Sequence, residues 1–195
     1  MAVPSDRDRR ALFLQLQGAN LRTAGRDGDA HQRFVAAMDL FEVNEDTEFS
    51  ASAAYDLAMS FRDLRTDIRR ENMLRARDLA ERALANEGRQ RDRLRYASTL
   101  DLLATIKRCL AEDAEKAERR ALLDSARADL ERAIRVGEQV VRLSRRPDAV
   151  RVLAGFLTSL GNHFLEARDA DRAIESYVRC VVKLDQCGGP GAGPA

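Results

Sequence analysis

The residue types that most often do chemistry are few and scattered in this chain. It has two histidines, His31 and His163, and three cysteines, Cys109, Cys180 and Cys187. Neither histidine has a cysteine or a carboxylate pair near it at the spacing of a metal site, and no CxxC pair occurs. The pattern therefore predicts neither a metal site nor a disulfide framework. A buried, inert thiol is predicted for Cys180.

The carboxylates are numerous but alternate with basic residues at helix-surface spacing, as between positions 115 and 120. Such alternation is typical of a solvated helix face rather than of paired catalytic acids. The chain also lacks a phosphate-binding P-loop, the glycine pattern of a dinucleotide site and the nucleophile elbow of hydrolases. We therefore expect no catalytic residue and no cofactor, and we predict that the protein is not an enzyme.

Overall charge points to no partner class. The 195 residues hold 33 Lys and Arg against 32 Asp and Glu, which gives a net charge of +1. Such a balance does not draw a chain to nucleic acid or to an anionic membrane. No apolar run approaches the roughly 20 residues that a membrane helix needs, and the N-terminus lacks the apolar stretch of a signal peptide. We expect a cytoplasmic protein that binds neither nucleic acid nor a membrane.

Two segments near opposite ends of the chain share one spaced pattern. In each, a glycine is followed by a small residue twelve positions later, an aromatic residue four further on and a small residue three after that. The positions are Gly18, Ala30, Phe34 and Ala37 in the first segment and Gly161, Ala173, Tyr177 and Cys180 in the second. Self-similarity of this kind is typical of stacked helix pairs.

Apolar residues recur at helical spacing along the chain, and no segment shows sustained strand alternation. We predict eight helices in four hairpins, at about 5–42, 47–87, 90–144 and 147–185, within one domain spanning 1–186. Residues 187–195, rich in glycine and proline, are predicted to be a flexible tail.

Capping residues and breakers predict where several helices begin and end. Asp29 is expected to cap the second helix, Asn72 to open the fourth and Pro147 the seventh. The turn between the fifth and sixth helices is placed near Glu112–Asp113, and the eighth helix is expected to end near Leu184.

The apolar positions predict which side of each helix is buried. Those of the first helix are Leu12, Leu14, Leu16, Ala19 and Leu21. Those of the second helix are Ala30, Phe34, Ala37, Met38 and Phe41, and the third carries Ala54, Leu57, Ala58 and Phe61.

Over residues 10–42 and 153–185 the pattern closely resembles the tetratricopeptide repeat, and the match is weaker between them. The middle segment from Leu57 to Leu74 also resembles, loosely, the repeats that precede CHAT-type caspase-like peptidase domains in bacteria. The resemblance implies an all-α, right-handed α-solenoid of about four hairpins. Small residues would let the helices of a pair approach, and large ones would interlock with the next hairpin.

The resemblance also implies a concave groove lined by the first helix of each hairpin. The groove positions carried over are Gln15, Ala19 and Arg22; Tyr55, Met59 and Arg62; Asp101, Thr105 and Arg108; and Thr158, Asn162 and Leu165. Arginine recurs at one slot in three hairpins, at Arg22, Arg62 and Arg108. These side chains could bind acidic groups through bidentate hydrogen bonds, or they could be ordinary surface arginines neutralised by Asp63 and Asp101.

The family resemblance implies a bacterial-type adaptor that binds a peptide or helix of another protein, acidic if the arginines take part. The alternative is a regulatory module that self-associates into a homodimer through its last helix, with Val178, Val181 and Val182 as the contact. That alternative rests on the lack of a polar terminal helix after Leu184. RNA binding is disfavoured by the neutral charge and the few aromatic residues.

Overall fold

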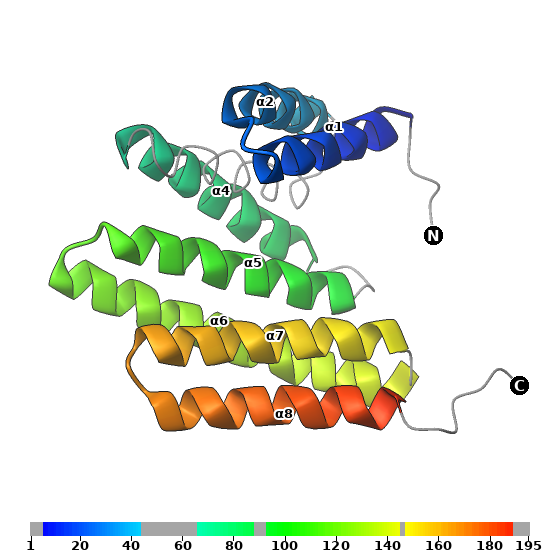
Figure 1. Ribbon diagram of the computed structural model, residues 1–195, viewed down its shortest axis with the longest axis vertical. Coiled ribbons are helices and arrows are strands. Elements are labelled where there is room, and N and C mark those ends of the chain that lie inside the picture. The colour runs from blue at the N-terminus through cyan, green and yellow to red at the C-terminus, as the bar shows by residue number, and fades with distance from the viewer. Residues whose placement is uncertain (1–5, 44–65, 88–92, 145–146, 189–195) are drawn as a thin grey trace, which may run out of the picture. The chain divides into compact units, whose positions relative to one another are not determined.

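The computed structural model describes residues 6–43, 66–87, 93–144 and 147–188, and within these ranges the chain forms seven α-helices and no strand (Figure 1). The helices are α1 (Asp6–Thr23), α2 (Asp27–Val43), α4 (Thr66–Glu87), α5 (Arg93–Glu112), α6 (Lys116–Ser144), α7 (Pro147–Glu166) and α8 (Ala170–Gly188). The predicted third helix lies outside the described residues. The chain divides into two compact units, residues 1–86 and 87–195.

In the first unit, α1 and α2 form a hairpin around a tight turn. Gly25 adopts a left-handed conformation with φ of 72°, and the amide of Arg26 donates to the carbonyl of Leu21 at 2.9 Å. This arrangement closes the last turn of α1 and reverses the chain, and glycine adopts it without steric cost.

The buried face predicted for α2 is confirmed, since Ala30, Phe34, Ala37, Met38 and Phe41 are all at most 3% exposed.

The prediction for α1 is wrong at Leu16, which is 64% exposed. Ala11 and Gly18 are buried instead. Leu16 precedes Gly18 by two residues, and two residues turn a helix by about 200°. The apolar type of Leu16 therefore does not indicate its side of the helix.

Helix α4 begins at Thr66, six residues before the expected start at Asn72. No glycine or proline lies between Thr66 and Asn72, so no helix-breaking residue prevents the helix from beginning before Asn72. Its buried side runs through Met73, Ala76 and Leu79 to Ala83.

The second unit contains two hairpins, α5–α6 and α7–α8, with α7 packed against both α6 and α5. Helix α5 ends at Glu112 and α6 begins at Lys116, which confirms the turn predicted near Glu112–Asp113. Inside the first of these hairpins, the Lys107 ammonium donates to Asp129 at 2.6 Å and to Ser125 at 2.9 Å. This largely buried ion pair joins α5 to α6.

The turn between α7 and α8 repeats the geometry of the α1–α2 turn with different residues. Arg168 has a φ of 60°, and the amide of Asp169 donates to the carbonyl of Phe164 at 2.8 Å. Asp169 Oδ1 accepts the amide of Arg172 at 3.2 Å, which caps α8.

Helix α8 differs from its prediction at two places. It continues to Gly188, past the end expected near Leu184. Cys180 is half-buried, with Sγ 3.5 Å from Thr158 Oγ1, so the prediction of a buried thiol is wrong. The position of Cys180 is open to solvent on one side because no helix packs beyond α8 among the described residues.

Two further observations bear on function. None of the described helices is both long enough and apolar enough to cross a membrane. Over the same residues, histidine, cysteine, aspartate and glutamate side chains nowhere gather in a group of three or more that could hold a metal ion.

Candidate partner-binding surfaces

The groove positions of the first hairpin lie on α1 beside its core aromatic residue. The Arg22 guanidinium lies 5.7 Å from the centroid of the Phe34 ring, within the range of a cation–π contact. Gln15 and Ala19 are half-buried on the same helix. Arg22 therefore covers a core side chain in addition to any role toward a partner.

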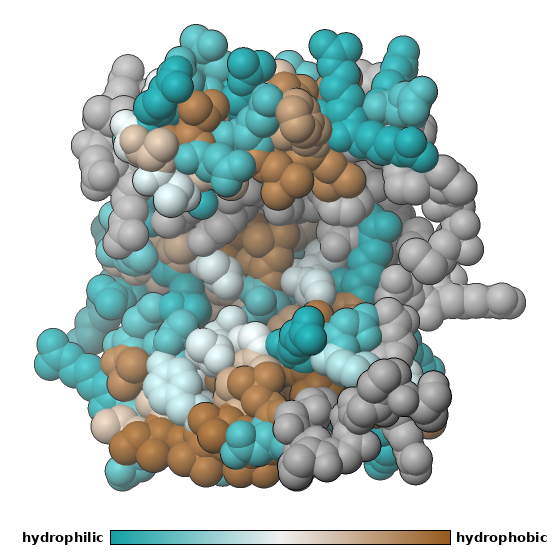
Figure 2. Space-filling view, turned by 45° about the vertical axis from the view of Figure 1, so that its right-hand side comes forward, coloured by the Kyte–Doolittle hydropathy of each residue, from teal (hydrophilic) through white to brown (hydrophobic). Residues whose placement is uncertain are grey.

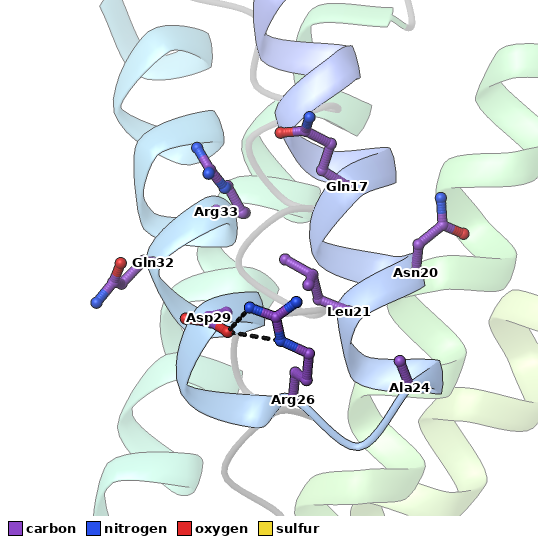
Figure 3. A pocket seen from close by; sticks show the side chains of 8 residues that line it. All are labelled: Gln17, Asn20, Leu21, Ala24, Arg26, Asp29, Gln32 and Arg33. Atoms are coloured by element: carbon purple, nitrogen blue, oxygen red, sulfur yellow. Dashed lines mark hydrogen bonds and ion pairs between the residues drawn. The ribbon is translucent and has the colours of Figure 1, made fainter.

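A pocket of about 420 Å³ lies at the α1–α2 turn (Figure 3). Arg26 and Asp29 meet within it, with Arg26 Nε donating to Asp29 Oδ2 at 2.8 Å. The sequence predicts Asp29 as the cap of α2, but α2 begins two residues earlier, at Asp27. The Asp29 carboxylate is turned to Arg26 instead, so one of the two arginines that line this pocket, Arg26 and Arg33, is already paired.

The groove positions of the second hairpin, Tyr55, Met59 and Arg62, lie outside the described residues. Arg22 and Arg108 belong to different units. The stack of three arginines therefore stays a prediction.

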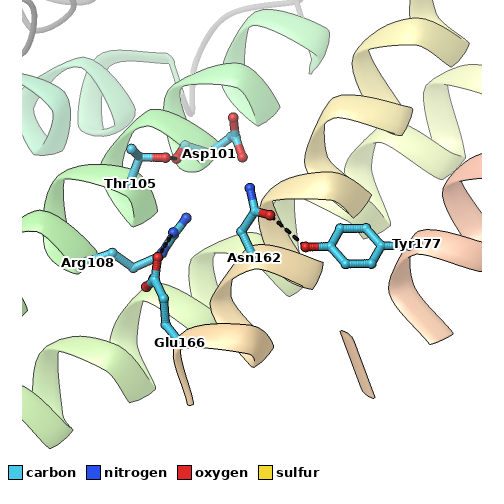
Figure 4. Close-up of polar contacts among 6 residues, drawn as sticks. All are labelled: Asp101, Thr105, Arg108, Asn162, Glu166 and Tyr177. Atoms are coloured by element: carbon cyan, nitrogen blue, oxygen red, sulfur yellow. Dashed lines mark hydrogen bonds and ion pairs between the residues drawn. The ribbon is translucent and has the colours of Figure 1, made fainter. Parts of the chain in front are cut away.

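In the second unit, α5 and α7 bring predicted groove residues together on adjoining helices (Figure 4). Arg108 forms two hydrogen bonds to Glu166, one of them from Nε to Oε2 at 2.9 Å. The Arg108 side chain is only 15% exposed, whereas that of Glu166 is 47% exposed. Arg108 is thus held in place by an acidic side chain of the next hairpin.

Asp101 is on the same helix as Arg108 and also lies between α5 and α7. Burial raises the pKa of its carboxyl, while the hydrogen bond from Ser159 and the charge of Arg108 act in the opposite direction. Thr105 donates to the backbone carbonyl of Asp101 at 3.0 Å, as residues four apart in a helix often do. The two helices therefore share a network of polar groups at this face.

The groove positions of α7 lie toward α8. Asn162 Oδ1 accepts the Tyr177 hydroxyl at 2.6 Å (Figure 4), and Thr158 donates to the carbonyl of Ala154 at 3.0 Å. Leu165 is 53% exposed.

Sequence reasoning missed Glu166, Ser159 and Tyr177 as members of this network. Glu166 is the residue directly after the carried-over position Leu165, and its charge opposite to that of Arg108 was the available signal.

The largest group of exposed apolar side chains in the described chain belongs to α8. Its members are 42–60% exposed and are Ile174, Val178, Val181, Val182 and Leu184. In Figure 2, apolar side chains gather along the lower edge of the molecule, where α8 lies in Figure 1. We refer to these five residues as the α8 face.

A comparison with α6, the second helix of the preceding hairpin, explains part of this exposure. We align the sequences of the two helices at their fully buried alanines, Ala126 and Ala173. In this alignment Ile134 of α6 corresponds to Val181 of α8. Ile134 is 4% exposed because α7 packs against α6, whereas Val181 is 55% exposed. Val181 thus occupies a position that the next hairpin would cover.

Leu184 corresponds in the same way to the buried Gly137, but the other three residues of the α8 face have no such explanation. The same alignment pairs charged residues of α6 with apolar residues of α8, namely Arg127 with Ile174, Glu131 with Val178 and Arg135 with Val182. The apolar surface of α8 is therefore wider than a continuing repeat array requires. Exposed apolar patches of this kind mark interaction sites.

Comparisons with known proteins bear on the fold. BtubC from P. vanneervenii aligns with a TM-score of 0.59 and 20% identity, covering 100% of this chain and 70% of that chain. MamA aligns at 0.44 with 18% identity over 91% and 80% of the chains, and a DHF58 filament at 0.48 with 17% identity over 95% and 97%. No protein-family model matches the chain, and no curated protein matches its sequence. The likeness to BtubC is one of fold, an all-α helical repeat.

Proposed function

We propose that this chain is a tetratricopeptide-like adaptor of the cytoplasm that binds a segment of another protein along the face formed by α5 and α7. The observation that supports the proposal is the packing of these two first helices, with Asp101, Thr105 and Arg108 on α5 and Asn162 on α7 (Figure 4). Polar side chains with fixed positions can recognise both the backbone and the charged groups of a bound segment.

Arg108 supports an acidic partner in particular. The carboxylate side of its ion pair with Glu166 is half open to solvent, so a partner carboxylate can approach the Arg108 guanidinium from that side. Such a carboxylate would take the place of Glu166 and would not leave the largely buried Arg108 unpaired. The rigid guanidinium would keep its bidentate geometry toward the new acid.

The test begins with affinity capture from the native cell and mass spectrometry to identify a partner. Binding is then measured for the parent chain, Arg108→Glu and Glu166→Gln. We expect Arg108→Glu to weaken binding and Glu166→Gln to strengthen it, because the second change removes the negative charge that competes with a partner carboxylate for Arg108. Arg142→Glu, an exposed position in the last turn of α6, is the control for net charge. Equal affinities in all four chains would contradict the α5–α7 site.

A second candidate function is self-association through the α8 face, and the apolar residues at positions where α6 is charged favour it. A second copy of the chain would bury the α8 face that the described residues leave open. Both members of a homodimer would use the same surface, as two-fold symmetry requires.

Sedimentation equilibrium separates this function from the first. The parent chain should show a concentration-dependent mass, and the double variant Val178→Glu/Val182→Glu should stay monomeric with unchanged helicity. Leu143→Glu removes a side chain that is 77% exposed on α6 and should leave the mass unaltered. A parent chain that is monomeric at high concentration would exclude self-association.

A further inference from the structure

A furrow runs between α6 and α8, over side chains of α7 that form its floor. Its two hollows, of about 310 and 320 Å³, share Arg127, Phe164 and Arg172. The Arg127 and Arg172 guanidinium groups lie 5.5 and 5.6 Å from the centroid of the Phe164 ring. The furrow lies between α6 and α8, and it shares only helix α7 with the proposed α5–α7 site.

The hollow toward the end of α8 is lined by four arginines and three glutamates. Arg127 donates to Glu131 at 2.8 Å, and Arg179 donates across the furrow to Glu138 at 3.3 Å. The charges that line this hollow are thus largely paired within the chain.

The other hollow, which we call the basic hollow, lies between the start of α6 and the α7–α8 turn. Its lining has five basic side chains, Lys116, Arg119, Arg120, Arg127 and Arg172, and two acidic ones, Asp124 and Asp169. This balance leaves an excess of positive charge. The first turn of α6 adds the positive end of a helix dipole.

The acids of the basic hollow do not neutralise all of its cations. Asp169 forms an ion pair with Arg172 at 3.1 Å. Asp124 lies 3.9 Å from Arg120, and the side chains of Asp124 and Arg120 are both at least 75% exposed. Among the described residues, Lys116 and Arg119 form no ion pair. Two cations thus remain for an external anion.

The floor of the basic hollow is mostly apolar. Leu123 and Ala167 contribute accessible carbon surface, and Phe164 and His163 lie beneath them at 7% and 4% exposure. Burial lowers the pKa of His163, and Arg108 and Arg127 lower it further, against the opposing charges of Glu166 and Asp124. A neutral imidazole therefore adds a polar edge but no charge, and its Nδ1 is buried without a hydrogen-bond partner among the described residues.

We propose that the basic hollow is a second protein-binding site, which takes an acidic segment of another protein with an apolar side chain beside its carboxylates. The apolar side chain would cover Leu123 and Ala167, and the carboxylates would bind Lys116 and Arg119. An apolar floor with a cationic rim fits such a segment better than a free phosphate, which needs several donors converging on one point.

The probe is a short synthetic peptide in which glutamate and leucine alternate, labelled for fluorescence anisotropy, with a glutamine-for-glutamate peptide beside it. The parent chain should bind the acidic peptide, and Lys116→Glu/Arg119→Glu should weaken binding by roughly tenfold or more, since two attractive contacts become repulsive. The control, Arg142→Glu/Arg151→Glu, makes the same change of net charge at exposed positions that do not line the hollow.

Each outcome decides the proposal. The proposal is supported if binding is lost in the Lys116→Glu/Arg119→Glu variant alone and that variant keeps its helicity. Titration of the parent chain with the peptide should then also shift the amide signals of His163 and Phe164. Equal binding of the glutamine peptide, or equal weakening in the control variant, overturns it. Displacement of the peptide by inorganic phosphate, beyond what sodium chloride achieves at the same ionic strength, would assign the hollow to phosphate instead. Amide shifts of Asp101 and Thr105 during the same titration would report binding at the α5–α7 face instead, so failure at that face is distinguishable.

Discussion

The first and last hairpins carry the same spaced pattern, yet they hold the aromatic ring of that pattern in different ways. Phe34 is fully buried, and its ring lies against Gly18 beneath the Arg22 guanidinium. Tyr177 packs against Gly161 in the same manner but is half-buried, and its hydroxyl reaches Asn162. The pattern specifies a ring against a glycine, and the surrounding residues decide whether that ring carries a polar group.

The small residue of each pattern should give the largest effect. Ala30 and Ala173 are both 0% exposed at the contact of two helices. Ala30→Arg and Ala173→Arg should each destabilise by about 3 kcal/mol or more, because an arginine there buries an unpaired charge. Denaturant unfolding followed by circular dichroism measures both. Ala128→Arg, on the exposed side of α6, is the control. An unchanged unfolding midpoint for either core variant would refute the shared register.

The glycines should distinguish the two hairpins. A Cβ atom on Gly18 would lie 2.6 Å from Phe34 Cε1, and one on Gly161 would lie closer still to Tyr177 Cε1. Gly18→Ala should cost about 1–3 kcal/mol, because the fully buried Phe34 ring cannot move aside. Gly161→Ala should cost less, because the half-buried Tyr177 can shift toward solvent. Urea unfolding of the two variants measures the difference.

A third glycine, Gly155, provides a reference for the stability changes of the Gly18 and Gly161 variants. Gly155 lies within α7, and a Cβ atom added to it would have no neighbour within 4 Å. Gly155→Ala should therefore stabilise by about 0.5–1 kcal/mol through helix propensity alone. If Gly161→Ala proves more costly than Gly18→Ala, the ring of Tyr177 is held more rigidly than its exposure indicates.

The buried face of α2 could be predicted from sequence because apolar residues recur there at three and four positions. The same reasoning failed at Leu16 and at the start of α4. Apolar type alone does not give a side chain's direction, and a helix without a breaker extends past its strongest cap signal. The turn predicted near Glu112–Asp113 is confirmed although no glycine or proline marks it.

The candidate surfaces could be predicted only in part. The positions of Asp101 and Arg108 on α5 followed from the repeat offsets, but their partners Ser159 and Glu166 lie on α7, more than fifty residues later. Which of several acids meets a given arginine depends on how two hairpins stack. The width of the α8 face likewise became visible only when α8 was aligned with the packed helix α6.

Exchanging the two rings tests why they differ. Ala19 stands where the last hairpin has Asn162, so a hydroxyl on Phe34→Tyr would lack the partner that Tyr177 has. Phe34→Tyr should cost about 1–3 kcal/mol, and Tyr177→Phe about 0.5–1.5 kcal/mol. Adding Ala19→Asn to Phe34→Tyr should recover part of the loss, measured as a double-mutant cycle from urea unfolding. Strict additivity of the two changes would show that the hydrogen bond does not transfer between the hairpins.

The smallest effect concerns the turns, where Gly25 and Arg168 occupy corresponding positions with φ of 72° and 60°. Both place the next amide on a carbonyl of the preceding helix, Leu21 in one case and Phe164 in the other. A left-handed conformation is strained for arginine but free for glycine, so Arg168→Gly should stabilise by about 0.5–1 kcal/mol despite the greater freedom of glycine in the unfolded chain. Gly25→Ala should cost about 1 kcal/mol or more for the converse reason. Thermal unfolding of both variants checks the pair, with Arg168→Ala removing the side chain while keeping the strain. If Arg168→Ala and Arg168→Gly change stability equally, the gain comes from losing the arginine side chain, and the two turns are not equivalent in backbone energy.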